Sequence, residues 1–220
     1  MASALAGSLR RRDLRDQARR LLDELGVCLA ANTDRLSVPG ERGTLIVANH
    51  VSWLDIVAAL AVEPTAFLAK HDIRSWPVIG SLAARNGTVF VDRRAMRRLP
   101  EVVAGLASAL RSGRSVVVFP EGTTWCGRCG QGVFRRAAFQ AAIDAGAPIR
   151  PVTIEYDQAG RPSTVAAFVG DDPLLTSFGR VARARDLRIR LTAHPTFPPE
   201  ADRRELAARA EACIRQAAYV

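Results

Sequence analysis

The sequence has no long apolar stretch, and this absence bears on how the protein can relate to membranes. Its longest unbroken apolar run, Ile56–Val62, is seven residues, whereas a membrane-spanning helix needs about 20. Residues 1–9 are followed directly by three arginines, and this order of charge and apolar residues differs from that of a secretory signal peptide. We therefore expect a cytoplasmic protein without a membrane-spanning segment.

Cysteine is scarce as well. The four cysteines, Cys28, Cys126, Cys129 and Cys213, are expected to be reduced in a chain without an export signal. Cys126 and Cys129 have the spacing of half a zinc site, but the other two form no second pair, and structural zinc takes four ligands. A redox pair usually lies near the start of a helix, and these two lie in a glycine-rich segment. We expect an ordinary loop and no metal site, with zinc and redox chemistry as less favoured alternatives.

Lysine is nearly missing, since 30 of the 31 basic residues are arginine. The 220 residues are 48% apolar and 24% charged, which is typical of a globular protein with a sizeable core. The net charge of +9 favours anionic partners, such as lipid headgroups, coenzyme A or an acidic carrier protein. We expect no nucleic acid partner, because zinc fingers and a basic region running into heptads are both missing.

Residues 1–40 are expected to form an N-terminal unit containing a basic amphipathic helix, and residues 41–220 the main domain. Within residues 10–31 one helical face carries five small or apolar residues, namely Leu14, Ala18, Leu21, Leu25 and Cys28. Arginines dominate the other face. Two interpretations stay open: the helix packs on the domain, or it lies on an anionic membrane surface.

From residue 44 onward, short β-rich runs alternate with helical patterns. The expected strands are residues 44–48, 66–69, 88–91, 115–119, 149–156, 164–169 and 187–192. The expected helices are residues 52–62, 77–85, 100–111, 134–145 and 200–217. Val116–Phe119 is apolar on both faces, as in a strand that is covered on two sides. The alternation predicts an α/β fold with a mostly buried mixed sheet flanked by helices.

The first candidate cluster, Asn49–Asp55, follows an expected strand and opens an expected helix. Ser52 and Asp55 have the spacing of a capping box at a helix start. His50 lies on the turn before the helix, from which its ring can fold back toward Asp55. A carboxylate on one ring nitrogen sets the tautomer and makes the other nitrogen a general base. The alternative is that Asp55 only caps the helix and His50 is an ordinary turn residue.

Two further clusters follow later strands. Phe119–Thr124 places Glu121 and Gly122 directly after a buried strand, at the sheet edge where ligands bind in open α/β proteins. The alternative there is a tight turn that needs the glycine. Gly87–Arg94 ends in two arginines, of which Arg93 could bind a phosphate through paired N–H donors. Solvated surface charge is the alternative for these arginines.

Together these clusters resemble the glycerolipid acyltransferase family, which includes 1-acyl-sn-glycerol-3-phosphate acyltransferases. The segments that match its first three motif blocks in order and spacing are residues 49–55, 87–93 and 119–124. Pro148–Val152 resembles the fourth block more loosely, because Arg150 stands where an apolar residue is more usual. Lys70 and Trp76–Gly80 also stand where family members carry similar residues. The resemblance covers about residues 40–195.

The resemblance implies a glycerol-3-phosphate acyltransferase-like fold and acyl transfer from a thioester of coenzyme A or acyl-carrier protein. The acceptor would be the free hydroxyl of a lysophospholipid such as 1-acylglycerol-3-phosphate, with phosphatidic acid as product. His50 would act as base with Asp55 orienting it, and backbone N–H groups near Gly122 and Thr123 would stabilise the oxyanion. The implied substrate-binding residues are Asn49, Ser52, Lys70, Gly87, Arg93, Glu121, Gly122 and Thr123, with Arg93 on the phosphate. No cofactor or metal is implied.

Other activities remain open at this point. The acceptor could be another lysolipid, such as a lyso-ornithine lipid or a glycolipid. The same base could activate water and make the protein an acyl-CoA hydrolase, or the protein could bind lipid without turnover. In the preferred interpretation the enzyme acts peripherally on the inner face of the cell membrane, with residues 10–31 and the arginines around residue 93 facing the lipid.

Overall fold

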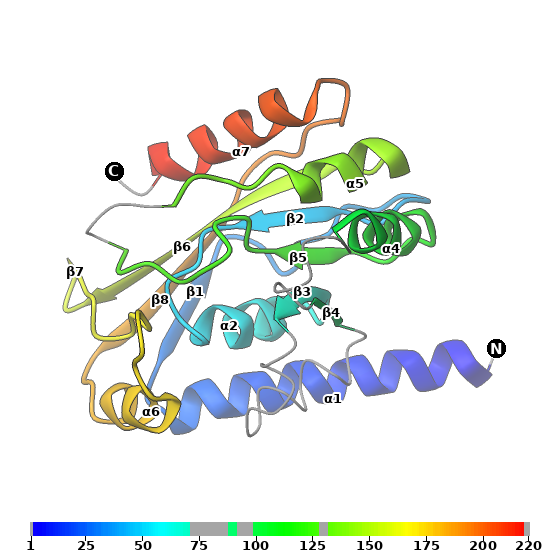
Figure 1. Ribbon diagram of the computed structural model, residues 1–220. Coiled ribbons are helices and arrows are strands. Elements are labelled where there is room, and N and C mark those ends of the chain that lie inside the picture. Colours follow the sequence, from blue (N-terminus) through cyan, green and yellow to red (C-terminus); the bar gives the residue numbers. More distant parts are fainter. Residues whose placement is uncertain (1, 71–87, 92–98, 128–131, 218–220) are drawn as a thin grey trace.

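A central sheet with helices on both sides forms the framework of the protein (Figure 1). The computed structural model describes residues 2–70, 88–91, 99–127 and 132–217. The strands are β1 (Cys28–Ala31), β2 (Leu45–Ala48), β3 (Ala66–Lys70), β4 (Val89–Val91), β5 (Val116–Val118), β6 (Ile149–Gln158), β7 (Arg161–Pro162) and β8 (Leu187–Ala193). The helices are α1 (Ala2–Glu24), α2 (Leu54–Val62), α4 (Leu99–Arg111), α5 (Ala137–Ala145), α6 (Leu174–Ala182) and α7 (Arg203–Ala217).

The sheet is mixed, as the sequence predicts. Its strand order is β1-β8-β6-β2-β5-β3-β4, and β7 pairs with β6 outside this path. The pairs of β2 with β5 and β6, of β3 with β4 and β5, and of β1 with β8 are parallel. The pairs of β6 with β7 and β8 are antiparallel. The expected α/β class with helices flanking a buried sheet is therefore confirmed.

Two apolar cores lie on the two faces of the sheet, and β2 contributes to both. Ile46 and Ala48 belong to the core shared with α1, α2 and α6. Leu45 and Val47 belong to the core shared with α4, α5 and α7. Because successive side chains of a strand point to opposite faces, a strand covered on both sides needs apolar residues at every position. The short run Leu45–Ala48 meets that requirement.

The N-terminal helix packs against the domain, which is one of the two interpretations left open above. Leu14 and Ala18 are buried, and the side chains of Arg15 and Arg19 each donate through Nε to the carbonyl oxygen of Ala61. The helix ends at Glu24 rather than continuing through residue 31. The segment that follows it becomes β1, the edge strand of the sheet. An amphipathic, membrane-facing role for this helix stays a prediction.

Three other sequence expectations differ from the structure or fall outside it. Residues 164–169 form irregular chain with one turn at Val165–Ala166 instead of the expected strand. The carbonyl groups of Val165 and Ala167 accept hydrogen bonds from the Arg180 side chain rather than from a neighbouring strand. The helix α6 that follows this segment was not predicted. Cys126 is disulfide-bonded rather than reduced, whereas Cys28 and Cys213 are free. Cys129 and the expected helix at residues 77–85 lie outside the described residues.

Candidate active site

The chain leaves β2 through a turn that Asn49 holds against β6. The side-chain amide of Asn49 donates to the carbonyl oxygen of Ile154 at 2.9 Å, and its Oδ1 accepts from the N–H of Ile154 at 2.8 Å. This side-chain contact lies just beyond the end of the parallel ladder between β2 and β6, where Ala48 pairs with Val152. Asn49 is buried, so its two hydrogen bonds also satisfy polar groups that water cannot reach. Asn49 therefore has a positioning role for the residues that follow.

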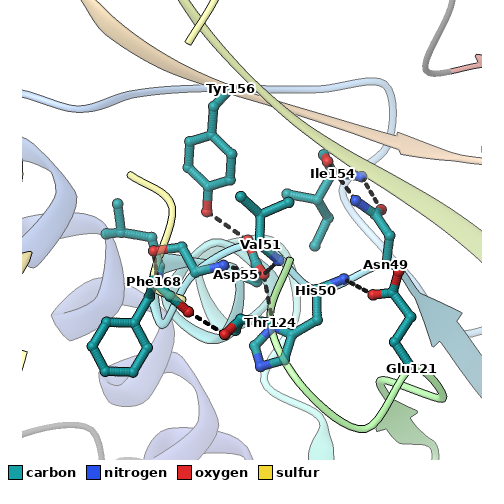
Figure 2. A network of polar contacts seen from close by, with 11 residues as sticks. Asn49, His50, Val51, Asp55, Glu121, Thr124, Ile154, Tyr156 and Phe168 are labelled. Carbon is teal, nitrogen blue, oxygen red and sulfur yellow. Dashed lines mark hydrogen bonds and ion pairs between the residues drawn. The ribbon is translucent and has the colours of Figure 1, made fainter. Parts of the chain in front are cut away.

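The carboxylate of Asp55 is the centre of the site (Figure 2). Its Oδ2 lies 2.8 Å from His50 Nδ1 and accepts from the backbone N–H groups of Val51 and Ser52 at 2.7 and 2.9 Å. Its Oδ1 accepts from the hydroxyl of Tyr156 at 2.5 Å. Asp55 is in the first turn of α2 and fully buried. Four donors and the helix N-terminus stabilise a charge that burial alone would penalise.

This arrangement corresponds to half of the expected capping box. Asp55 receives the N–H of Ser52, and Ser52 Oγ accepts from the N–H of Leu54 at 3.3 Å. The helix itself begins at Leu54. The capping role and the contact with His50 are therefore not alternatives, because the same oxygen of Asp55 serves both.

The ring of His50 is held between Asp55 and an aromatic neighbour. It stacks on Phe119 with ring centroids 4.0 Å apart and an interplanar angle of 13°. Because an ionised carboxylate can only accept a hydrogen bond, the proton between Asp55 and neutral His50 lies on Nδ1. The lone pair on Nε2 is then free to accept a proton from a substrate. The side chain is 14% exposed, which leaves it accessible from the surface.

Glu121 approaches the same turn from β5. Its Oε2 accepts from the backbone N–H of His50 at 2.7 Å, whereas Oε1 is buried and accepts no hydrogen bond from the described part of the chain. Burial is the main cause that raises the pKa of Glu121 to about 7. The N–H groups of His50 and Gly132 lower this pKa, the charge of Asp55 raises it, and the charge of Arg215 lowers it. Near neutral pH this side chain is therefore divided between its acid and its carboxylate form.

Gly122 and Arg135 form the adjoining surface. Gly122 has φ +78°, and a Cβ atom there would lie 2.8 Å from Cζ of Arg135. The guanidinium group of Arg135 thus lies directly over the glycine, and this exposed side chain has no hydrogen bond or ion pair to any residue the structure describes. Thr123 is exposed beside it. The Thr124 hydroxyl donates to the carbonyl oxygen of Phe168, which ties this loop to the segment before α6.

The structure brings together most of the residues that the sequence singled out, and leaves three of them undecided. His50 and Asp55 meet, Asn49 and Ser52 support them, and Glu121–Thr123 lie at the neighbouring strand end. Lys70 is the last residue of β3, and its side chain is outside the described part. Gly87 and Arg93 also lie outside the described residues, so their roles stay predictions.

Three contributors were missed by the sequence analysis: Tyr156, Phe119 as a ring partner, and Arg135. Tyr156 is 101 residues from Asp55 in the chain, and no local pattern links the two. The alternation along β6 places Tyr156 on the same face as Ile154, which is the one signal that could have pointed to it. Arg135 reaches Gly122 only because the loop after Gly132 returns to the strand end, where the N–H of Arg135 donates to the carbonyl oxygen of Pro120.

The chain is similar to known acyltransferases in sequence. The acyltransferase family model matches residues 31–155. A lyso-ornithine lipid O-acyltransferase from Pseudomonas aeruginosa is 38% identical over 176 residues, covering 80% of this chain and 67% of that protein. A 1-acyl-sn-glycerol-3-phosphate acyltransferase from Neisseria meningitidis is 40% identical over 151 residues, covering 68% of this chain and 58% of that protein. The chain thus spans between 58% and 67% of the length of these relatives.

The fold also has a counterpart among solved structures. The crystal structure of the 1-acyl-sn-glycerophosphate acyltransferase PlsC from Thermotoga maritima superposes with a TM-score of 0.67 at 22% sequence identity. The match covers 94% of this chain and 78% of the other. At that level of identity the likeness is one of fold, and it agrees with the family match over the residues that carry His50, Asp55 and Glu121. The chain belongs to the acyltransferase family.

Proposed function

We propose that the protein transfers an acyl group from an acyl thioester to the free hydroxyl of a lysolipid. The observation that carries the proposal is the contact of 2.8 Å between His50 Nδ1 and the buried Asp55, which leaves Nε2 as a base at the sheet edge. The names of the relatives, which act on lysophosphatidate or lyso-ornithine lipid, support a lysolipid acceptor.

The side chains present account for each proton in this reaction. Nε2 of His50 takes the proton from the acceptor hydroxyl as its oxygen attacks the thioester carbonyl, while Asp55 keeps the ring in the required tautomer. Collapse of the tetrahedral intermediate breaks the carbon–sulfur bond, and the imidazolium returns the proton to the thiolate. The product is an ester and a free thiol, with no covalent intermediate on the enzyme. A positioned base of this kind contributes about 10²–10⁴-fold to rate.

The sequence suggested that backbone N–H groups near Gly122 and Thr123 stabilise the oxyanion, and the structure favours only one of these two. The N–H of Gly122 already donates to the carbonyl oxygen of Phe119 at 3.1 Å, so it is occupied. The N–H of Thr123 donates to no acceptor in the described part of the chain. We therefore propose Thr123, and not Gly122, as the backbone donor to the oxyanion.

The acceptor headgroup is proposed to lie over Glu121 and Gly122. Arg135 faces this position, and Arg93 remains a candidate from the second motif block. A guanidinium group binds a phosphate or a carboxylate through paired N–H donors. Arg135 therefore suits the phosphate of 1-acylglycerol-3-phosphate and equally the carboxylate of a lyso-ornithine lipid. We propose coenzyme A or acyl-carrier protein as carrier of the acyl group, no cofactor, and peripheral attachment to the inner face of the cell membrane.

The first test replaces the base. We expect His50→Ala to lower transfer from labelled acyl-CoA to a panel of lysolipids by at least about 10²-fold, because the base contributes that much. The product is read by mass, and free fatty acid is measured in the same samples. His194→Gln serves as the control, since His194 lies apart from the site with its ring on Thr153. Near-normal transfer by a folded His50→Ala protein, or fatty acid release without lysolipid at the transfer rate, would refute the assignment.

The second test concerns the headgroup. We expect Arg135→Ala to raise the KM for the acceptor about tenfold with little change in kcat, because a surface guanidinium contributes binding rather than chemistry. Arg136→Ala is the matched control, since Arg136 is the neighbouring exposed arginine and stands just before α5. Comparing lysophosphatidate with lyso-ornithine lipid shows which anion Arg135 contacts. An unchanged KM for every acceptor would remove this role.

A further inference from the structure

Exposed apolar side chains gather on one segment of the molecule. The described residues include five large hydrophobic side chains that are exposed, and three of them, Val169, Leu175 and Phe178, lie on α6 or just before it. They are 41%, 81% and 41% exposed, respectively. Single exposed apolar residues are normal, but three on one short segment mark an interaction surface. We call these three residues the α6 patch.

The α6 patch is fixed to the turn that carries the base. Trp53 is buried between Ser52 and Leu54, and its Nε1 donates to Ser177 Oγ on α6 at 3.1 Å. The ring of Phe178 stacks on Trp53 with centroids 5.9 Å apart. Since His50 and Asp55 flank Trp53 in the chain, the orientation of the patch and that of the catalytic pair are set by the same short segment.

The segment before α6 adds a second attachment. The N–H of Phe168 donates to the carbonyl oxygen of Val51 at 3.0 Å, and its carbonyl oxygen accepts from the Thr124 hydroxyl. Arg180 holds the same segment from α6, through the carbonyl oxygens of Val165 and Ala167. Backbone polar groups of this segment thus form hydrogen bonds with the rest of the protein. The apolar side chains of the patch are left outward, where nothing in the described chain covers them.

The charge around the α6 patch is positive on balance. Residues 169–190 carry five arginines and three aspartates. Asp172 is paired with Arg180 at 2.6 Å, whereas Arg183 and Arg185 are exposed just past the end of α6. Apolar side chains flanked by exposed arginines match an anionic bilayer surface, where apolar groups enter the interface and basic groups meet the headgroups. Helix α1 also carries more arginines than acidic residues, six against four. Its apolar side chains Leu14, Ala18 and Leu22, however, are buried against the domain and are not available to a bilayer.

We propose that the α6 patch is the surface by which this protein docks on an anionic lipid bilayer. Leu175 and Phe178 enter the interface, and the attachments of α6 hold the His50 turn at the bilayer surface. This orientation would bring His50 to the acceptor, because the hydroxyl of a lysolipid lies at the level of the headgroups. That part of the inference rests on the proposed function. The docking itself is independent of turnover and is tested without substrates.

The experiment is co-sedimentation of the full chain with vesicles of phosphatidylglycerol and phosphatidylcholine in equal parts, without acyl donor or acceptor. We expect Leu175→Ser to lower the partition coefficient about tenfold, which corresponds to about 1.4 kcal/mol. We expect Leu175→Trp to raise it, because tryptophan favours the interface. Leu99→Ser is the matched control, since Leu99 is also exposed but lies on α4, and it should bind as the parent protein does. Neutral phosphatidylcholine vesicles should bind all variants weakly.

Two outcomes would overturn the proposal. One is equal partition of the parent protein, Leu175→Ser and Leu175→Trp. The other is a parent dimer in the absence of lipid that Leu175→Ser converts to a monomer without a change in partition, which would assign the patch to a second copy of the chain. Transfer to a water-dispersed short-chain lysolipid is measured alongside and should be the same for Leu175→Ser and the parent. If partition behaves as expected but no acceptor is acylated, the proposed function fails and the docking surface stands.

Discussion

At the scale of single residues, two carboxyl groups lie beside His50 and are held in opposite ways. Asp55 receives four hydrogen bonds, from a ring nitrogen, two backbone N–H groups and a hydroxyl. Glu121 accepts a hydrogen bond from the N–H of His50, and its buried Oε1 accepts none with normal geometry from the described residues, although the N–H of Gly132 also lowers its pKa. Burial therefore raises the pKa of Glu121 to about 7. The difference leaves Asp55 with a full set of donors and makes Glu121 a group that titrates near neutral pH.

The raised pKa of Glu121 predicts a pH-dependent stability. Between the usual pKa of 4.5 and the folded value of about 7, the unfolded chain loses this proton and the folded protein keeps it. The free energy of unfolding therefore falls as pH rises through this window, by about 3 kcal/mol at about 1.4 kcal/mol per pKa unit. We expect Glu121→Gln to remove this loss. The free energy of unfolding of the variant should therefore rise relative to that of the parent protein between about pH 5 and pH 8.

Urea unfolding of both proteins at several pH values measures this difference. Glutamine keeps an acceptor for the N–H of His50, so the comparison isolates the titration. If the two free energies of unfolding run parallel across the window, Glu121 is not titrating there.

At the scale of elements, α2 is anchored at both ends. All nine of its residues are buried, which explains why Ile56–Val62 is apolar without a helical period. At its start, Asp55 binds the turn with His50. At its end, Arg15 and Arg19 donate to the carbonyl oxygen of Ala61, and Glu63 accepts from the N–H of Leu36 in the loop between β1 and β2. The helix thus holds the catalytic turn in a position set by contacts on both sides.

The contacts of Glu63 predict a loss of stability on its removal. Its Oε2 accepts from the N–H groups of Leu36 and Ser37 at 2.6 and 2.7 Å, and its Oε1 accepts from the Ser37 hydroxyl at 2.6 Å. We expect Glu63→Ala to lower the free energy of unfolding by about 3 kcal/mol, because donors bonded to a charged acceptor are left without it. Glu41→Ala, at an exposed position, should change it by less than about 0.5 kcal/mol. Equal losses in chemical denaturation would contradict this role.

At the scale of the whole molecule, the strand order brings the site together. β2 lies between β5 and β6, although these strands are far apart in the chain. The ends of β2 and β5 supply His50 and Glu121, and β6 supplies the hydroxyl of Tyr156. Sheet edges that collect residues from parallel strands in this way are the usual place for ligands in open α/β folds.

The strand order also predicts which strands are most resistant to local unfolding. We expect the slowest amide hydrogen exchange in β2, β5 and β6, since these central strands are buried under helices on both faces. The edge strands β1 and β7 should exchange faster, because they are partly exposed and have a neighbour on one side. Exchange followed by mass spectrometry checks this ranking. Protection in β1 equal to that in β2 would contradict it.

The local order of residues made the pairing of His50 with Asp55 possible, because the turn, the helix start and the carboxylate lie within one short segment. The resemblance to the acyltransferase family was needed to prefer this pairing over an ordinary capped turn. The local order was enough to predict the alternation of strands and helices, since burial on two faces leaves a visible apolar pattern in β2 and β5. The sequence analysis missed α6, although its apolar residues follow a helical period. The helix is nine residues long and contains Gly179, which is unfavourable in a helix. The small number of cysteines also did not predict that Cys126 is disulfide-bonded.

Contacts between distant segments were decided by the tertiary structure alone. Tyr156 reaches Asp55, and Arg135 reaches Gly122, only once the strands stand in their order. The pKa of Glu121 likewise depends on how deeply the packed sheet buries it, and burial is a property of the assembled molecule. The chain by itself determined which groups could react, through their chemistry and their spacing within a turn. The fold decided their protonation and their neighbours, because both depend on the exclusion of water by segments far apart in the sequence.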